Sequence, residues 1–435
     1  MVSLQPVFWK AYWTLAGVGI AWGVFVLALC VPWVQRNALY AHKFQTGLWG
    51  NVSVPEEFGF AKGQVQPFWL ETSDKERLFC WHVLPLDVYL ENELELATAA
   101  ASGEVVEELK GTVGEKLLRR DPESRVVVNF HGNAGHVAQG HRPSTYRSIS
   151  GIPHTHLLTC DYRGFGLSSL NNPPHLPTET GLINDAISLL SYIRTTLNHP
   201  PSRTVLLGQS LGTAVTAASA LYFTHPDSKH LPHDLTHPVP LTPSKPPPPS
   251  PFAGIILVSP FTDLPTLLKT YKIGGLLPVL KPLRGYPRIA HWITLRILDP
   301  WPTLARLDAL VAASLAAGPA PHLHSHLHLH ILHARNDQAI DWTHAERVFQ
   351  PLATRLLSLE NAHVREERRS IHGGERVTRG AFAYKRVEDG RGARTLELEV
   401  VRFGGHNEVV GWAPVGLAVR RAFERRSLRP GLDVE

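Results

Sequence analysis

Apolar residues along the chain gather in short runs that are typical of buried strands. Eight such runs occur, at 67–71, 78–84, 126–130, 156–160, 205–207, 254–258, 327–333 and 396–403. Helical patterns separate several of them, at 178–197, 211–223, 343–357 and 413–425. Strands that alternate with helices form mainly parallel sheets with helices on both faces. The pattern therefore predicts one α/β domain built on an eight-stranded sheet.

The first two runs are joined by Ser73-Asp74-Lys75-Glu76, a turn that predicts an antiparallel hairpin at the edge of the sheet. Three other stretches interrupt the pattern and are expected to be solvated insertions. They lie at about 91–122, which is rich in Glu and Ala, at about 228–251, and at about 360–394, which is charged. Residues 237–251 predict stiff polyproline, for which binding of an adaptor protein is the alternative to a plain loop.

The N-terminal region predicts a membrane span. Residues 11–34 contain no charged side chain, and a helix of that length crosses a hydrocarbon core of about 30 Å at about 1.5 Å per residue. Lys10 and Arg36 bracket the run, and tryptophans lie near both of its ends. The run is longer than the apolar part of a cleaved signal peptide. We expect a tail at 1–10, a transmembrane signal anchor at 11–34, a connector at 35–65 and one domain at 66–435.

The orientation of this span depends on a glycosylation sequon. Lys10 and the amino terminus on one side are balanced by Arg36 and Lys43 on the other, so the distribution of positive charge decides little. The tripeptide Asn51-Val52-Ser53 lies just beyond the span on the side of the domain. It favours a single-pass protein of the endoplasmic reticulum with the large domain in the lumen; a chance tripeptide is the alternative.

Charge and cysteine content exclude other classes of protein. The chain has 43 Lys and Arg against 38 Asp and Glu, a net charge of +5 that is too balanced to indicate nucleic acid as a partner. Cys30, Cys80 and Cys160 stand in apolar runs without the spacing of a zinc site. We expect neither a disulfide framework nor a bound metal, and the sequence leaves the oligomeric state open.

The strongest chemical signal is the motif Gly208-Gln209-Ser210-Leu211-Gly212. It directly follows the apolar run 205–207 and precedes a helical run of small residues. A sharp strand-to-helix turn of this form holds the serine in a strained conformation and needs glycines on both sides. It presents the serine Oγ at the N-terminus of the helix, so Ser210 is the candidate nucleophile.

A serine nucleophile needs a base, and the base needs a carboxylate that orients it. After a motif of this kind the acid and then the histidine follow in chain order, each after a later strand. Asp337 comes after the run 327–333 and is the candidate acid; Asp341 is the alternative, with an N-cap as its structural role. His406 follows the last run in a turn with flanking glycines, and it is the candidate general base.

The oxyanion of a tetrahedral intermediate needs two N–H donors. The candidates are the backbone N–H of Leu211, directly after the nucleophile, and that of Asn133, in the loop after 126–130. No cofactor is expected. Histidines also alternate along an extended stretch, at His322, His324, His326, His328 and His330. We expect these imidazoles to be solvated or partly paired rather than metal ligands, because no carboxylate or cysteine completes a ligand set nearby.

Five segments together carry a family resemblance: HGNAGH at 131–136, DYRGFGLS at 161–168, GQSLG at 208–212, LHARND at 332–337 and GGHNEV at 404–409. With them the chain resembles the α/β hydrolases, and most closely the membrane-anchored lysophosphatidylserine and monoacylglycerol lipases, from about Gln66 to the C-terminus. The resemblance implies the α/β-hydrolase fold and a serine hydrolase of lipid esters, with Ser210, Asp337 and His406 at the triad positions.

A segment at about 264–318 is expected to form a cap over an acyl pocket. It combines apolar residues with the basic residues Lys272, Lys281, Arg284, Arg288 and Arg296. Such a surface could rest on an anionic bilayer, and an ordinary packed cap is the alternative. The predicted function is a membrane-anchored serine hydrolase of lysophospholipids or monoacylglycerols. The alternatives are an acyl-protein thioesterase with the same triad and a catalytically silent module that binds a lipid or a protein.

Overall fold

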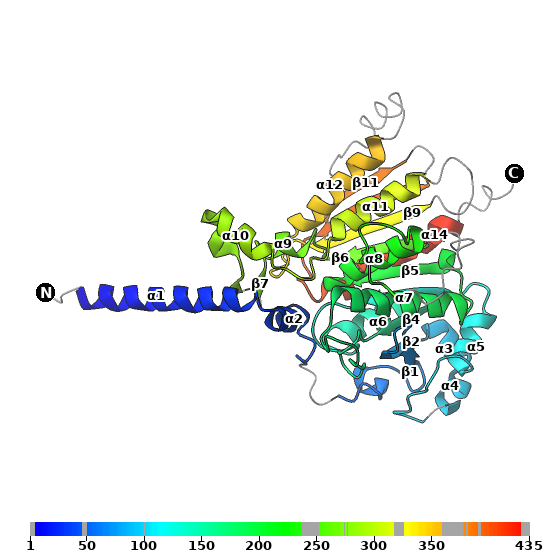
Figure 1. Ribbon diagram of the computed structural model, residues 1–435. Helices are drawn as coiled ribbons and strands as arrows, with labels where there is room; N and C mark the ends of the chain where they lie inside the picture. The colour runs from blue at the N-terminus through cyan, green and yellow to red at the C-terminus, as the bar shows by residue number, and fades with distance from the viewer. Residues whose placement is uncertain are drawn as a thin grey trace.

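The computed structural model describes residues 5–45, 50–99, 101–236, 252–273, 275, 277–316, 326–358, 377–379, 382–389 and 393–427. A ten-stranded sheet with helices packed against it forms its centre (Figure 1). All eight strands expected from the sequence occur. The order along the sheet is β1 (Val65–Glu71), β2 (Arg77–Val83), β4 (Thr155–Cys160), β3 (Arg125–Phe130), β5 (Thr204–Gln209), β6 (Gly254–Val258), β9 (Leu327–Ala334), β12 (Arg394–Val401), β11 (Phe382–Glu388) and β10 (Val377–Arg379).

The sheet is parallel in its centre and antiparallel at its edges. The strands from β4 through β12 pair in parallel, whereas β1 and β2 form the expected antiparallel hairpin at one edge. β11 and β10 extend the opposite edge, within the stretch expected to be a charged insertion. Polar residues such as Lys385 and Arg386 weaken the apolar signal of β11, because a strand near an edge can be solvated on one face. Residues 359–376 of that insertion lie outside the described residues.

Side chains that alternate along each strand divide the core between two faces of the sheet. Val126 and Val128 point to the face covered by α7 (Glu179–Thr195), α8 (Leu211–Thr224), α11 (Thr303–Ala316) and α12 (Thr343–Ser358). Val127 points to the other face, which α6 (Arg142–Ser150) and α14 (Ala413–Ser427) cover. Burial on both faces explains why the central strands read as continuous apolar runs.

The cysteines correct one expectation. Cys80 on β2 and Cys160 on β4 lie directly opposite each other in an antiparallel pair and form a disulfide, whereas Cys30 is free. The two cysteines are 80 residues apart in the chain. The expectation that no disulfide forms is therefore wrong. The thiols meet because β2 pairs with β4, and no local spacing in the sequence indicates that pairing.

His330 is paired, which is one of the two expected states of the alternating histidines, but carboxylates do lie nearby, contrary to expectation; His322 and His324 lie outside the described residues. The parallel register of β9 and β12 places Glu397 opposite His330. The imidazole of His330 is fully buried, with Nδ1 3.2 Å from Glu397 Oε2 and Nε2 3.4 Å from Glu399 Oε2. The carboxylates that the local sequence lacks therefore come from the neighbouring strand.

The N-terminal region forms two helices, α1 (Gln5–Ala28) and α2 (Pro32–Tyr40). The long helix therefore begins before the expected span of 11–34 and ends within it. Pro32 has no N–H with which to continue α1, and it starts α2 instead. Within the described residues, Pro6–Ala28 form a helix that is long and apolar enough to cross a membrane. Figure 1 shows α1 projecting away from the sheet.

Polar contacts fasten α2 to the body of the protein. The Arg36 guanidinium donates to the Asp299 carboxylate, with Nε 3.0 Å from Oδ2. The Gln35 side chain donates to the carbonyl oxygens of Leu29 and Arg296, at 3.0 and 3.1 Å. Gln35 and Asp299 are buried, so water competes little for these bonds. The junction between α1 and α2 is thereby fixed against residues 296–299, which follow α10.

The cap follows β6 and is built from short elements. They are α9 (Leu264–Leu267), β7 (Lys272–Ile273), β8 (Leu277–Pro278), a 3-10 helix at Lys281–Gly285 and α10 (Pro287–Thr294). In Figure 1, α9 and α10 lie on the same side of the sheet as α1. α11, at the end of the expected cap range, packs on α8 and α12 and is one of the helices over the sheet.

The first insertion is helical, as its composition suggests, and packs beside the β1–β2 hairpin. It contains α4 (Glu93–Ala99) and α5 (Val113–Arg120), and α3 (Leu86–Glu91) precedes them. Leu96, Leu109 and Leu117 are buried, so this segment is not a solvated loop. The polyproline stretch at 237–251 lies outside the described residues.

Candidate active site

Ser210 stands at the turn between β5 and α8. Its backbone has a φ of 52°, which few non-glycine residues adopt, and its N–H donates to Val258 O on β6 at 2.9 Å. A Cβ on Gly212 would lie 1.9 Å from Phe130 O, and one on Gly208 would lie 2.5 Å from Gly212 O. Only glycines allow β3, β5 and α8 to approach this closely, which is the physical reason for the G-x-S-x-G spacing.

Three loops that are distant in the sequence converge at Ser210. His406, in the loop after β12, has Nε2 3.1 Å from Ser210 Oγ and Nδ1 2.7 Å from Asp337 Oδ2. If Nδ1 carries the hydrogen that the Asp337 carboxylate accepts, the lone pair of Nε2 faces the serine hydroxyl. The structure thus brings together the three residues expected to act as nucleophile, acid and base, in a geometry that permits proton transfer from Oγ to Nε2.

The carboxylate of Asp337 is buried and held on both oxygens. Its Oδ1 accepts the N–H groups of Ala339 and Ile340, each at 2.9 Å, and its Oδ2 lies 3.2 Å from His333 Nε2. Burial alone would raise the pKa of Asp337, but hydrogen bonds from His333 and His406 outweigh it and hold the pKa far below its usual range. The group therefore stays ionised and can orient His406.

Asp341, the alternative acid, has a different position. It is exposed, and its Oδ1 accepts the N–H of Thr343 at the start of α12, at 2.9 Å. Partial burial would raise its pKa, but the hydrogen bonds of Thr343 lower it overall. These contacts are those of a residue that caps a helix.

The loop after β3 lies beside Ser210, as its expected role requires. A Cβ on Gly132 would be 3.4 Å from Ser210 Cβ, and Asn133 lines the same cavity as Ser210 and Leu211. Leu211 is the first residue of α8, so its N–H has no acceptor within the helix. The two expected oxyanion donors thus belong to the two chain segments that flank the serine.

Arg142 shapes this loop, a role that sequence reasoning missed. Its guanidinium is buried and donates to carbonyl oxygens of four loop residues at 2.6 to 3.2 Å: Gly132, Asn133, Ala134 and His136. The C=O and N–H of one trans peptide point in opposite directions. The Gly132 carbonyl that binds Arg142 therefore turns the N–H of Asn133 away from the guanidinium. No motif marks this arginine, which begins α6 outside the recognisable loop sequence.

The end of α2 and the residues directly after it hold the other side of the same loop. The N–H of Ala134 donates to Tyr40 O at 2.9 Å, and that of Gly135 donates to Phe44 O at 2.8 Å. The N-terminal region therefore helps to position the loop that carries Asn133, the second expected oxyanion donor. Nothing in the local sequence at 40–44 indicates this contact.

Gln209 links the nucleophile turn to the loop of the base. Its Nε2 donates to His406 O at 3.0 Å, and its Oε1 lies 3.0 Å from His141 Nε2. Since an amide oxygen only accepts, His141 donates its Nε2–H to Gln209. Burial lowers the pKa of His141 to about 4, so this imidazole is neutral at pH 7.

Residues of the DYRGFG motif, at 161–166, form hydrogen bonds that support the loops of the site. Arg163 donates to the carboxylates of Asp185 and Asp74, at 2.8 and 2.7 Å. The hydroxyl of Tyr162 donates to His131 O in the oxyanion loop at 3.0 Å. Burial raises the pKa of Asp161 to about 8, although the nearby Arg142 guanidinium opposes the shift. The motif that contributes to the resemblance is thus architectural.

A cavity of about 380 Å³ opens beside Ser210 and is lined mainly by apolar side chains. Its size falls within the range of about 300–1,000 Å³ that is usual for small-molecule sites. Apart from the nucleophile turn and Asn133, its walls come mainly from the cap, α2 and the end of α1. Representative residues are Leu267, Leu280, Ile293, Leu39 and Val26.

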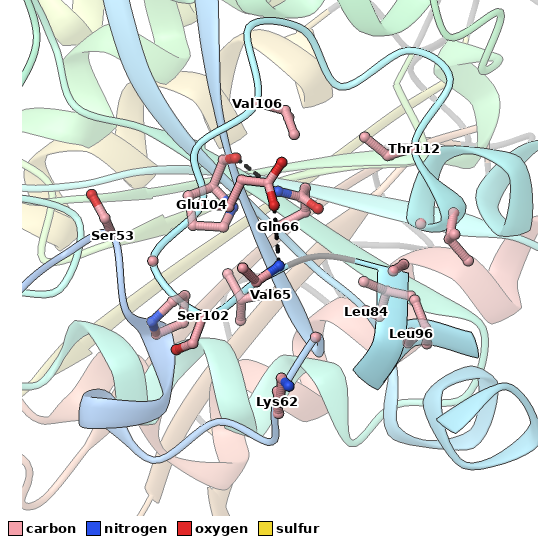
Figure 2. Close-up of a pocket in the computed structure, with 18 of the residues that line it drawn as sticks. Ser53, Lys62, Val65, Gln66, Leu84, Leu96, Ser102, Glu104, Val106 and Thr112 are labelled. Carbon is pink, nitrogen blue, oxygen red and sulfur yellow. Dashed lines mark hydrogen bonds between the residues drawn. The ribbon is translucent and has the colours of Figure 1, made fainter. Parts of the chain in front are cut away.

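Figure 2 shows a second cavity, of about 180 Å³, between the connector, β1 and the first insertion. Ser53, Lys62, Gln66 and Glu104 are among its lining residues, and none of the three triad residues lines it. The carboxylate of Glu104 accepts the N–H of Ala101 at 3.0 Å and so stabilises its own turn. The cavity at Ser210 is therefore the candidate active site.

Among the described residues, His328, His330 and Glu397 have ligand atoms close enough to hold a metal, within 4.8 Å of one another. Both ring nitrogens of His330 already contact carboxylates, and Glu399 also lies 3.4 Å from Arg421 Nη2. This network of opposite charges accounts for the burial of these groups.

No model of a known protein family matches the sequence. Over 201 residues the chain is 25% identical to the lysophosphatidylserine lipase ABHD12 of Danio rerio, across 46% of this chain and 45% of that protein. It is 28% identical over 188 residues to protein bem46 of Schizosaccharomyces pombe, across 42% and 48%. The matches thus span less than half the length of these relatives. The structure of an alpha-beta hydrolase from Vibrio vulnificus aligns over 91% of this chain and 94% of that one, with a TM-score of 0.50 and 13% identity.

Proposed function

We propose that this chain, which has the α/β-hydrolase fold and resembles the ABHD12 lysophosphatidylserine lipases, is a serine hydrolase that cleaves esters of single-chain lipids. Lysophospholipids and monoacylglycerols are the substrate class. The observation that carries the proposal is the position of His406, between Ser210 Oγ at 3.1 Å and Asp337 Oδ2 at 2.7 Å, beside an apolar cavity.

In the proposed reaction Ser210 Oγ attacks the ester carbonyl while His406 Nε2 takes its proton. The N–H groups of Leu211 and Asn133 stabilise the oxyanion, and ionised Asp337 stabilises the imidazolium. His406 then protonates the leaving alcohol, which leaves an acyl group on Ser210. A water molecule, deprotonated by His406, releases the fatty acid. These steps need no metal or cofactor.

We also propose that α1 anchors the protein and that the domain faces the lumen of the endoplasmic reticulum. Asn51 is exposed, and its Oδ1 accepts only the local N–H of Ser53 in the described contacts. The Cys80–Cys160 disulfide adds support, because disulfides persist in oxidising compartments. Expression in a eukaryotic cell should give a glycosidase-sensitive mobility shift that Asn51→Gln removes. Digestion of the domain by protease outside sealed microsomes would place it in the cytosol and favour the acyl-protein thioesterase.

The function is tested with Ser210→Ala in cells and in membranes. A fluorophosphonate probe should label the wild type, and both Ser210→Ala and His406→Ala should lose the label, because activation of Oγ needs the base. Lipid profiling of cells that carry Ser210→Ala should show accumulation of lysophospholipids or monoacylglycerols. Undiminished labelling of Ser210→Ala would place the nucleophile elsewhere. Unchanged lipids together with increased protein S-acylation would support the thioesterase instead.

A further inference from the structure

The end of α1 has two different faces. Trp22, Val26 and Leu29 recur at helical spacing and meet the cap, where Trp22 Nε1 donates to Val279 O at 3.1 Å. Val26 is only 3% exposed, whereas Val24 and Leu27, on the opposite face, are 62% and 57% exposed. One face of the helix is therefore packed against the protein, and the other is free to contact lipid.

The packed face is also a wall of the candidate active site. Phe25, Val26, Leu29 and Cys30 line the cavity that contains Ser210. A ligand in that cavity would touch both the reactive serine and the helix that is long enough to cross a membrane. The anchor and the substrate site are thus continuous.

We propose that the end of α1 and the cap together form the acyl-binding site, and that the acyl chain of a bilayer lipid enters it directly from the hydrocarbon region beside α1. This inference rests on the proposed lipid-ester hydrolase and adds where the chain binds and from which side it comes. A chain that moves from the bilayer into this cavity stays out of water on the way, so its apolar surface never has to be hydrated.

The outer surface of the cap is suited to the membrane boundary. Apolar side chains are exposed there next to α1, among them Tyr286, Ile289, Trp292 and Leu295. Exposed basic residues alternate with them, namely Lys281, Arg284, Arg288 and Arg296. Aromatic and basic side chains together favour the headgroup region of a bilayer. A cap at that depth brings the cavity, whose wall the cap shares with α1, next to the bilayer.

Cys30, the free cysteine in the cavity wall, allows a direct test with the full-length protein in phosphatidylcholine vesicles. Ser210 is first reacted with an ethyl or a dodecyl fluorophosphonate, and the rate of maleimide labelling of Cys30 is then measured. The dodecyl chain should slow the labelling at least fivefold relative to the ethyl chain, because it occupies the wall at Cys30. Equal rates would overturn the inference while leaving the hydrolase intact. Failure of both phosphonates to react with Ser210 would overturn the proposed function and the inference with it.

A matched pair of substitutions tests the same site by specificity. Leu29 lines the cavity, whereas Leu27, two residues earlier, faces outward. The ratio of kcat/KM for a 16-carbon ester to that for a 2-carbon ester should fall at least tenfold in Leu29→Trp, because the indole fills the acyl site. Leu27→Trp should leave the ratio unchanged. The same ratio in both variants and the wild type would show that α1 does not bind the chain. Equal losses in both variants would point to a disturbed helix and would equally contradict the inference.

Discussion

The triad and the acyl cavity are built in contrasting ways. Ser210, Asp337 and His406 each follow the C-terminal end of a parallel strand, so the sheet itself brings them together. The cavity wall instead joins α1, α2 and the cap, which touch only through tertiary contacts such as the bond between Trp22 and Val279, 257 residues apart. In the proposed function, catalysis therefore depends on the sheet, whereas the choice of substrate depends on how separate elements dock.

The largest effect should come from the carboxylate of the triad. Asp337→Asn should lower kcat by about 10⁴, because the imidazole loses the carboxylate that orients it and stabilises its charge. Asp341→Asn, a matched change four residues later, should leave kcat nearly unchanged, since Asp341 caps α12. Steady-state hydrolysis of a short soluble ester measures both. A greater loss in Asp341→Asn would exchange the roles of the two residues.

A smaller but still large effect is expected in the loop at 131–136, which carries Asn133. Arg142→Gln removes the partner of the Gly132 carbonyl, so the N–H of Asn133 is expected to be misplaced. Loss of one oxyanion donor should lower kcat by about 10²–10³ with little change in KM. Arg147→Gln on the same helix is the control, because the Arg147 side chain is exposed. Equal kcat values for the two variants would mean that the loop keeps its shape without Arg142.

Two N-terminal deletions test whether the triad and the loop at 131–136 depend on the N-terminal region. Since all triad residues follow residue 66, the sequence alone predicts that a chain without residues 1–43 keeps its activity on short esters. The structure predicts a loss of about 10- to 100-fold, because Tyr40 no longer holds the oxyanion loop and small misplacements are costly. A deletion of residues 1–21 leaves Trp22, α2 and the loop contacts in place and should retain the activity. Equal rates for both truncated forms would show that the triad and the loop at 131–136 do not depend on the N-terminal region.

The smallest expected effect is a loss of folding stability at low pH through His141, which hydrogen-bonds Gln209 beside Ser210. The pKa of His141 is lowered to about 4 in the folded state, so between about pH 6.5 and 4 the unfolded chain binds a proton that the folded protein does not. Stability should therefore fall as the pH decreases through this window, by at most about 1.4 kcal/mol per pH unit for this group. His141→Gln can still donate to Gln209 and should flatten the pH dependence of denaturant unfolding between pH 6.5 and 5. An unaltered slope would mean that His141 is not buried in solution.

Eight strands and the edge hairpin could be predicted along the chain, because each central strand has its own local signature, whereas the order of the strands in the sheet was not predicted. Apolar runs such as 126–130 and 205–207 are buried on both faces and carry the pattern without help from their neighbours. β11 was missed because its polar residues interrupt the apolar pattern of a strand, and its strand conformation depends on pairing with β12. The disulfide was missed for a related reason, since Cys80 and Cys160 become neighbours only when β2 and β4 pair.

Ser210, Asp337 and His406 could be chosen as candidates from the chain alone, because a strained turn between strand and helix requires glycines at fixed spacing and the other two loops follow recognisable strands. The groups that surround these residues could not be chosen in this way, because they depend on how the elements pack. Gln209 and the carbonyl of Tyr40 act through contacts that join distant segments, and Arg142 folds back onto the loop a few residues before it. Such contacts leave no periodicity or spacing in the chain, since their energy depends on three-dimensional proximity and burial. The wall formed by α1 is of this kind: residues 22–29 read as an apolar helix, and only their docking on the cap makes one face of it part of a cavity beside Ser210.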